Sequence, residues 1–143
     1  MSASNYNHQL DAKNRMRIPA KFREELGANY TITIGVDGCL NVYSAEQVAE
    51  LKELLGKING FRKGPVRAER LILSNMWDAV EDNQGRIRLP ENLRTYAKIV
   101  KNVKVFKGPT CIEIWSEEVW NDYFKDVNFN DLADAIDSLK NNG

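Results

Sequence analysis

The chain carries one motif twice, and this repetition restricts the folds that it can adopt. Residues 11–23 read DAKNRMRIPAKFR, and residues 82–94 read DNQGRIRLPENLR. At an offset of 71 residues, the aspartate, three arginines and the proline of the first copy recur in the second. An internal repeat restricts the overall fold more strongly than local sequence patterns do. Two copies are too few for a solenoid. We therefore expect two similar halves related by a pseudo-two-fold axis.

The later parts of the two halves also correspond. CLNVYSAEQV at 39–48 aligns with CIEIWSEEVW at 111–120, at an offset of 72 residues. Each half is expected to contain a strand, a basic turn, a short helix, two strands and a second helix. The expected divisions are a first repeat at 1–59, an inter-repeat linker and helix at 60–75, a second repeat at 76–125, and an acidic C-terminal helix and tail at 126–143.

Composition indicates a globular protein without a membrane partner. Of 143 residues, 43% are hydrophobic and 28% are charged, which is typical of a folded domain. No apolar run approaches the length that a membrane-spanning helix needs. The N-terminal MSASNYNHQLD has neither the basic nor the apolar region of a signal peptide. We expect the protein to be cytoplasmic.

The charges are unevenly distributed, although the formal net charge is zero. Residues 86–107 carry seven Lys or Arg and one Glu, whereas residues 108–143 carry two Lys and eight Asp or Glu. Local potential, rather than net charge, attracts a polyanion. The same asymmetry would allow the acidic C-terminal part of one chain to meet the basic stretch of another, head to tail.

Polar and apolar residues alternate immediately after each basic turn. Arg15 and Arg17 fall on one face of the predicted strand, and Met16 and Ile18 fall on the other. The second copy, RIRL at 86–89, repeats this alternation. Asn at position 14 and Gly at position 85 both suit the left-handed backbone of a tight turn.

Standard helix and turn signals organise the rest of each half. A short helix is expected to begin at Pro19 and at Pro90. Ser44 with Gln47 predicts a capping box for a helix whose apolar stripe extends to Ile58. The segment 59–65, with two glycines and a proline, is the expected hinge, and another helix is expected at 66–75.

The sequence offers no constellation for catalysis, and we expect no enzyme activity, metal, cofactor or small-molecule substrate. Its single histidine, His8, lies in an N-terminal segment without a catalytic motif, and no nucleotide-binding or hydrolase motif occurs. Cys39 and Cys111 occupy equivalent apolar positions and are interpreted as small buried side chains. Asp11 and Asp82 are candidates for a carboxylate pair, but each precedes an arginine by four residues, so turn capping or arginine pairing is favoured.

The repeated arginines suggest recognition of an anionic partner. A solvated surface is the simpler interpretation, but arginine rather than lysine stands at every repeated basic position, which favours bidentate recognition. If the two copies pair as strands, their arginines share one face of a β-ribbon. Such a ribbon fits the major groove of double-stranded DNA. The candidate DNA-binding residues are Lys13, Arg15, Arg17, Arg86 and Arg88.

Over nearly its full length the sequence resembles the MraZ family of bacterial transcriptional regulators, which contain two AbrB-like (SpoVT-AbrB) repeats. The resemblance rests on DAKNR and IPAKFR in the first copy, DNQGR and LPENLR in the second, and the strand–turn segments DGCLNVY and IEIW. Asn14 stands where the family usually has glycine. By residue match, Arg15 and Arg86 inherit the DNA-contact role, with Asp11 and Asp82 as their motif partners.

The resemblance implies an α+β fold in which the two repeats form an intrachain swapped-hairpin β-barrel with flanking helices. It also implies a ring-shaped homo-oligomer associated with the nucleoid. The ring would bind short repeated DNA boxes upstream of the protein's own operon of cell-division and cell-wall genes.

Two other functions remain open at this point. One is an AbrB-type antitoxin that binds a toxin protein and its own promoter, with the acidic helix at 130–139 as the toxin-binding tail. The other is an enzyme of unknown type, for which the sequence supplies no residues.

Overall fold

The structure is a computed structural model that describes residues 5–57, 61 and 63–142. It confirms the expected α+β class. The strands are β1 (Asn5–Gln9), β2 (Arg15–Met16), β3 (Tyr30–Ile34), β4 (Leu40–Ser44), β5 (Trp77–Asp78), β6 (Ile87–Arg88), β7 (Asn102–Lys107) and β8 (Ile112–Ser116). The helices are α1 (Ala20–Leu26), α2 (Ala45–Leu55), α3 (Lys63–Ser74), α4 (Glu91–Ala97), α5 (Glu117–Phe124) and α6 (Phe129–Asn142), with a short 3-10 turn at Val36–Gly38.

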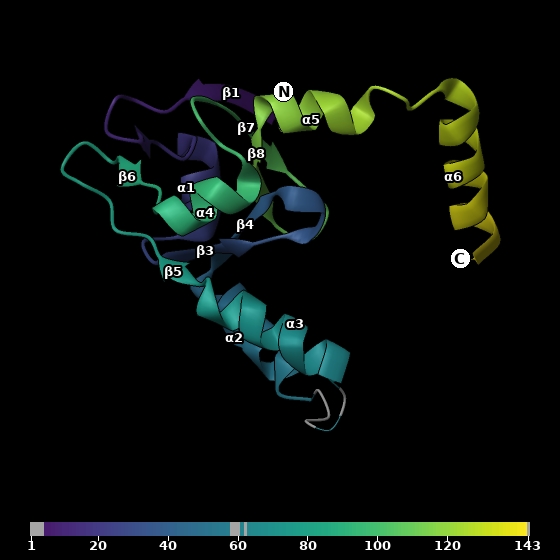
Figure 1. Ribbon diagram of the computed structural model, residues 1–143, viewed down its shortest axis with the longest axis horizontal. Coiled ribbons are helices and arrows are strands. Elements are labelled where there is room, and N and C mark those ends of the chain that lie inside the picture. Colours follow the sequence, from purple (N-terminus) through teal and green to yellow (C-terminus); the bar gives the residue numbers. More distant parts are fainter. Residues whose placement is uncertain (1–4, 58–60, 62, 143) are drawn as a thin grey trace.

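The sheets have the pseudo-two-fold symmetry that the repeat predicts (Figure 1). Six antiparallel strands follow the order β1-β7-β8-β4-β3-β5, and this order is preserved when the two repeats are exchanged and the list is reversed. The axis passes through the Asn41–Glu113 pair of β4 and β8 and the Met16–Ile87 pair of the separate β2–β6 ladder. Strands of one repeat therefore lie between strands of the other.

The six-stranded sheet is open among the residues that the structure describes. Its end strands, β1 and β5, pair with β7 and β3 respectively and form no ladder with each other. The β2–β6 ladder is a second, two-stranded sheet. The described strands thus show an interleaved arrangement but not a closed barrel.

One hydrophobic core joins the two repeats. Phe22, Ile32 and Leu40 of the first repeat and Leu93 and Ile114 of the second are at most 1% exposed, and all belong to one cluster. Burying a large apolar side chain contributes about 1.5–3 kcal/mol. Because each repeat supplies side chains to the same core, neither repeat has a core of its own.

Short sequence signals predicted most elements correctly, although three helices begin at other residues than expected. Ser44 and Gln47 form the predicted capping box. Pro19 and Pro90 are the N-caps of α1 and α4 rather than their first helical residues. Helix α3 begins at Lys63, three residues before the expected start, because Pro65 falls within its first turn, where a missing N–H costs no helical hydrogen bond.

Parts of the predicted hinge and stripe lie outside the described residues. Positions 59, 60 and 62 of the hinge and Ile58 of the stripe belong to this group. The described part of the same helix ends at Leu55, whose side chain is buried.

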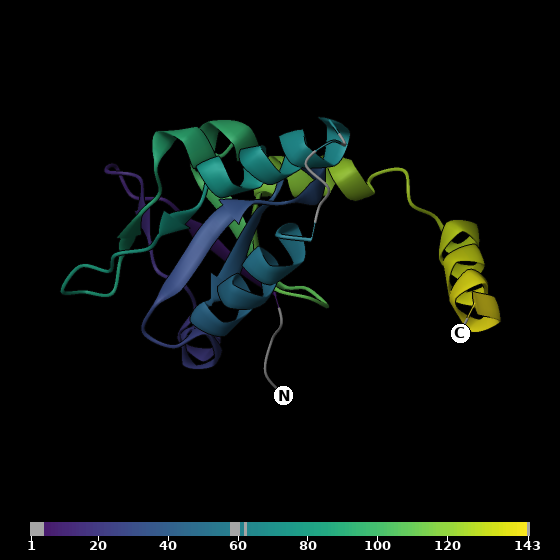
Figure 2. The same ribbon diagram turned by 90° about the horizontal axis from the view of Figure 1, so that it is seen from below.

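The helices occupy two sides of the sheet, and the two ends of the molecule differ. Figure 2 shows α1 and α2 on the lower side and α3, α4 and α5 along the upper side. In both views the turns that flank β2 and β6 project at one end, whereas α6 stands apart from the body at the other. Within the described residues, no helix is long and apolar enough to cross a membrane.

Candidate nucleic-acid interface

The two motif copies meet in the β2–β6 ribbon. Arg15 lies directly opposite Arg88, and Met16 lies opposite Ile87. Residues opposed across an antiparallel pair point to the same face. Met16 and Ile87 are 3% and 0% exposed, so their face is the core and the arginine face is the outer one. The structure therefore confirms the predicted alternation, and it shows that the two copies pair as strands.

The first turn is fixed by the carboxylate of Asp11. Its Oδ1 accepts hydrogen bonds from the backbone N–H groups of Lys13 and Arg15, each at 2.9 Å. Its Oδ2 accepts from Arg15 Nε at 2.8 Å. Asn14 has a φ of 60°, as the turn requires. One carboxylate thus shapes the turn and also orients the arginine that follows it.

The second turn repeats this geometry. Asp82 Oδ1 accepts from the backbone N–H groups of Gln84 at 2.8 Å and Arg86 at 2.9 Å, and Oδ2 accepts from Arg86 Nε at 2.8 Å. Gly85 has a φ of 76°. Arg15 Nη1 also lies 4.0 Å from Asp82 Oδ2, which links the two copies. Turn capping and arginine pairing, the favoured interpretation of both aspartates, are confirmed.

These hydrogen bonds stabilise the ionised carboxylates. The N–H of Arg15 is the main cause that lowers the pKa of Asp11, and the N–H of Arg86 is the main cause that lowers the pKa of Asp82 to about 2. Both aspartates therefore remain charged at neutral pH.

We expect the second turn to keep its geometry from neutral pH down to strong acid. A carboxyl pKa that folding depresses contributes stability above the ordinary value near 3.8, and this contribution is lost as pH falls toward about 2. Carboxyl carbon NMR of Asp82 should therefore titrate with a midpoint near 2. An ordinary midpoint would contradict the observed hydrogen bonding.

The guanidinium groups of Arg15 and Arg86 are oriented but not fully occupied. Their side chains are 25% and 27% exposed, respectively, and their Nε atoms are bound to the aspartates. Among the described residues, the Nη atoms of Arg86 have no hydrogen-bond partner. An arginine fixed at Nε can present its terminal N–H groups to a phosphate or to guanine O6 and N7.

The other candidate residues differ in what they contact. Arg17 Nε donates to the backbone carbonyl of Gln84 at 2.7 Å. This arginine of the first motif copy therefore supports the turn of the second copy. Lys13 and Arg88 are exposed, and within the described part of the chain their side chains form no hydrogen bond or ion pair. Lys13 and Arg88 are therefore the unoccupied cations of this surface.

The last arginine of each copy is bound to a protein acceptor. Arg23 Nη2 lies 2.5 Å from Glu81 Oε1, and the other oxygen of Glu81 accepts from Tyr30 Oη at 2.7 Å. Arg94 Nε donates to the carbonyl of Leu89 at 3.0 Å. The role of Glu81 has no signal in the repeat, because the equivalent residue of the first copy is Leu10.

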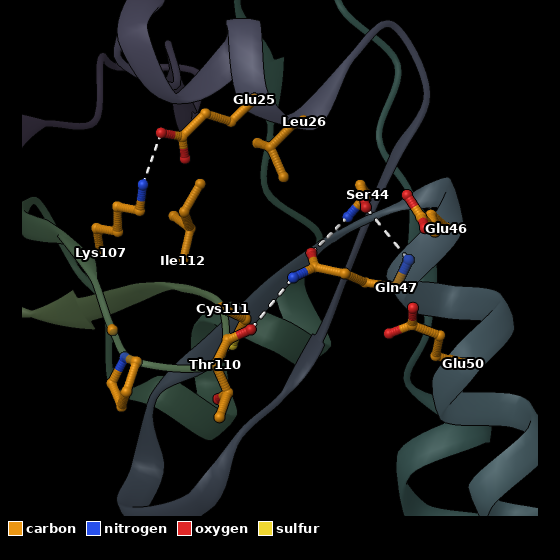
Figure 3. Close-up of a pocket in the computed structure, with 12 residues that line it drawn as sticks. Glu25, Leu26, Ser44, Glu46, Gln47, Glu50, Lys107, Thr110, Cys111 and Ile112 are labelled. Carbon is orange, nitrogen blue, oxygen red and sulfur yellow. Dashed lines mark hydrogen bonds and ion pairs between the residues drawn. The ribbon is translucent and has the colours of Figure 1, made fainter.

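A separate polar cavity of about 440 Å³ lies between α1, α2 and the turn that joins β7 to β8 (Figure 3). Lys107 Nζ lies 2.6 Å from Glu25 Oε1 at its edge, and Gln47 Nε2 donates to the carbonyl of Thr110 at 3.2 Å. These contacts link the two repeats. No candidate DNA-binding residue lines the cavity. Its carboxylates are Glu25, Glu46 and Glu50.

The histidine and the thiols lie in protected positions. Desolvation lowers the pKa of His8 and raises the pKa of Cys39 to about 12. Cys39 and Cys111 are buried and free. Within the described residues, no group of three or more His, Cys, Asp or Glu side chains could hold a metal ion.

Comparison with known proteins identifies close relatives. A family model described as "MraZ protein, putative antitoxin-like" matches residues 1–61 and 79–141. The chain is 42% identical over 141 residues to "Transcriptional regulator MraZ" from Thermoanaerobacter sp. (strain X514), covering 97% of this chain and 99% of the relative. Proteins with the same name from Caldanaerobacter subterraneus subsp. tengcongensis and Alkaliphilus metalliredigens are 41% and 38% identical, with the same coverage.

Proposed function

The chain belongs to the MraZ family, and on that premise we propose that it is a transcriptional regulator that binds double-stranded DNA through the β2–β6 ribbon. The observation that carries this proposal is the pairing of two motif copies, with apolar residues facing the core and arginines facing outward. Arg15 and Arg86 are proposed to contact bases or phosphates, with Lys13, Arg17 and Arg88 as supporting cations. Asp11 and Asp82 position the two principal arginines.

The structure of the ribbon suits this role. Two oriented guanidinium groups project from two rigid turns of one surface, so little side-chain freedom is lost when they meet DNA. Such a site acts by binding and needs no catalytic residue. We propose that the protein works in the cytoplasm, at the nucleoid.

The target and assembly that we propose follow from the family resemblance. The target is a set of short repeated boxes upstream of the protein's own cell-division and cell-wall operon. The assembly is a ring-shaped homo-oligomer. We also propose that residues 1–59 and 76–125 are two SpoVT-AbrB repeats, joined by a linker and helix at 60–75. Residues 126–143 form an acidic C-terminal helix and tail. The interleaved strands are proposed to correspond to a swapped-hairpin barrel.

Fluorescence anisotropy with duplex DNA from upstream of the gene tests the proposed function. Specific binding should survive excess unrelated duplex DNA. If no fragment from that region binds in preference to unrelated DNA, the proposed function is wrong.

We expect binding to weaken as salt increases. If each chain neutralises two to four phosphates, log K should fall against log[salt] with a slope of about −2 to −4 per chain. Anisotropy titrations across a series of potassium chloride concentrations measure this slope. A flat dependence would show that the exposed cations do not contact the DNA backbone. The Lys13→Ala variant should make the slope less negative by about one, because one phosphate contact is lost.

A second candidate function is an antitoxin that binds a toxin protein through α6. It is favoured by the exposure of this acidic helix along its whole described length. A small basic protein that co-purifies with the intact chain, but not with a chain ending at residue 126, would support it.

A further inference from the structure

The second turn is supported by contacts that begin in the core. Tyr30 is 2% exposed, and its hydroxyl donates to Glu81 Oε2 at 2.7 Å. The other carboxylate oxygen, Glu81 Oε1, lies 2.5 Å from Arg23 Nη2 of helix α1. Glu81 directly precedes Asp82, the residue that binds Arg86 Nε. The residue before the second turn is therefore tied to β3 through one oxygen and to α1 through the other.

The guanidinium group of Arg23 also lies against the second turn itself. The position that a β-carbon would take at Gly85 is 3.7 Å from Arg23 Nη1, while Nη2 of the same group binds Glu81. On the same turn, the carbonyl of Gln84 accepts a hydrogen bond from Arg17 Nε at 2.7 Å. Two arginines of the first motif copy thus support the turn of the second copy.

The first turn lacks this support among the described residues. Leu10 stands where the second copy has Glu81, so no carboxylate is available there. Arg94, the counterpart of Arg23, donates within its own copy. A backbone N–H of the second copy donates to the carbonyl of Asn14 at 3.1 Å, but no described side chain of that copy donates to a carbonyl of this turn. The pseudo-two-fold relation is therefore broken in the way that the two turns are held.

We propose that Glu81, together with Arg23, positions Arg86 for DNA and makes the second turn the more rigid of the two. The inference rests on the proposed function and identifies residues that affect DNA binding through Arg86. An arginine on a turn that is already fixed loses less conformational freedom when it meets DNA. Arg23 also neutralises the Glu81 carboxylate, whose charge would otherwise repel phosphates near this surface.

Amide hydrogen exchange without DNA tests the support of the turn. The change Glu81→Leu introduces the residue that the first copy has at the equivalent position. The Gly85 N–H donates to the carbonyl of Asp82 at 3.0 Å, and the Asn14 N–H donates to that of Asp11 at the same distance. Exchange at Gly85 should become about 10-fold faster, because hydrogen bonds to a charged group are lost, and exchange at Asn14 should stay unchanged. Unchanged exchange at Gly85, or equally faster exchange at both turns, would overturn the inference.

Binding of one-box duplex DNA separates positioning from charge. Glu81→Leu removes a negative charge, so electrostatics alone predicts tighter binding. Loss of positioning instead predicts roughly 2- to 10-fold weaker binding, the cost of ordering one long side chain. This loss should persist in the Arg15→Ala background and disappear in the Arg86→Ala background, because the effect depends on Arg86. Tighter binding, or an equal loss in both backgrounds, would overturn the inference.

Two further variants complete the test. Glu24→Leu is the matched control, because Glu24 is exposed beside Arg23 and its side chain forms no hydrogen bond or ion pair with a described residue. It should leave Gly85 exchange unchanged and should not weaken binding. Glu81→Gln keeps an acceptor for Tyr30, so it should act in the same direction as Glu81→Leu with a smaller effect, and it carries the test if the leucine variant does not fold. Absence of specific binding by the unaltered chain would refute the proposed function, whereas unchanged Gly85 exchange would refute only this inference.

Discussion

DNA with several correctly spaced boxes should bind the assembled protein about 10²–10⁴-fold more tightly than DNA with one box. One chain presents a single β2–β6 ribbon, which is a small contact surface. In a ring, neighbouring ribbons stand at fixed spacing, so that binding of the second box becomes intramolecular and gains affinity without a new contact. Anisotropy titrations with one-box and multi-box duplexes of equal length measure the gain.

A spacing control separates this effect from ordinary affinity. Changing the spacing between boxes by half a helical turn should remove most of the gain, because the boxes then face opposite sides of the duplex. Equal affinity per box for one-box and multi-box duplexes would contradict the avidity mechanism.

Removing both principal arginines should abolish specific binding while the fold persists. If Arg15 and Arg86 contact bases, each substitution by alanine costs about 1–3 kcal/mol of binding free energy, so the double variant loses roughly 30- to 10⁴-fold in affinity. Both side chains lie on the outer face of the ribbon and are not part of the hydrophobic core. Circular dichroism should therefore show a cooperative unfolding transition in the double variant.

A matched control removes two positive charges elsewhere. Lys52→Ala with Lys101→Ala alters exposed lysines outside the ribbon and should change specific affinity far less. The sequence dependence of the loss also identifies the contact. Base contacts would relax sequence preference, whereas phosphate contacts would weaken all duplexes evenly. Unchanged affinity in the Arg15→Ala, Arg86→Ala double variant would exclude these arginines from the interface.

The features that depend on short-range pattern were predictable from the sequence. Alternation placed Met16 and Ile87 in the core, and the four-residue spacing predicted that Asp11 and Asp82 hold their arginines. The pseudo-two-fold relation followed from the repeat. The alternation and the aspartate–arginine contacts were predictable because each depends on residues at most four positions apart.

The features that depend on contacts between distant residues were not predictable in this way. Arg17 donates to the backbone carbonyl of Gln84, which has no signature in the sequence. Arg23 belongs to the motif by spacing, yet its side chain pairs with Glu81, 58 residues away, a contact that the spacing does not indicate. The pattern of residues 129–139 predicted a helix, but it gave no sign that the apolar side chains of α6 stay exposed in the described chain.

Amide hydrogen exchange, with and without one-box duplex DNA, tests the central claim most directly. If DNA binds through the β2–β6 ribbon, amide exchange should slow in residues 11–17 and 82–88, which contain the two turns and the ribbon. Exchange in α2 should stay unchanged. Protection of α2, or of another surface away from the ribbon, with no change at 11–17 and 82–88, would contradict it.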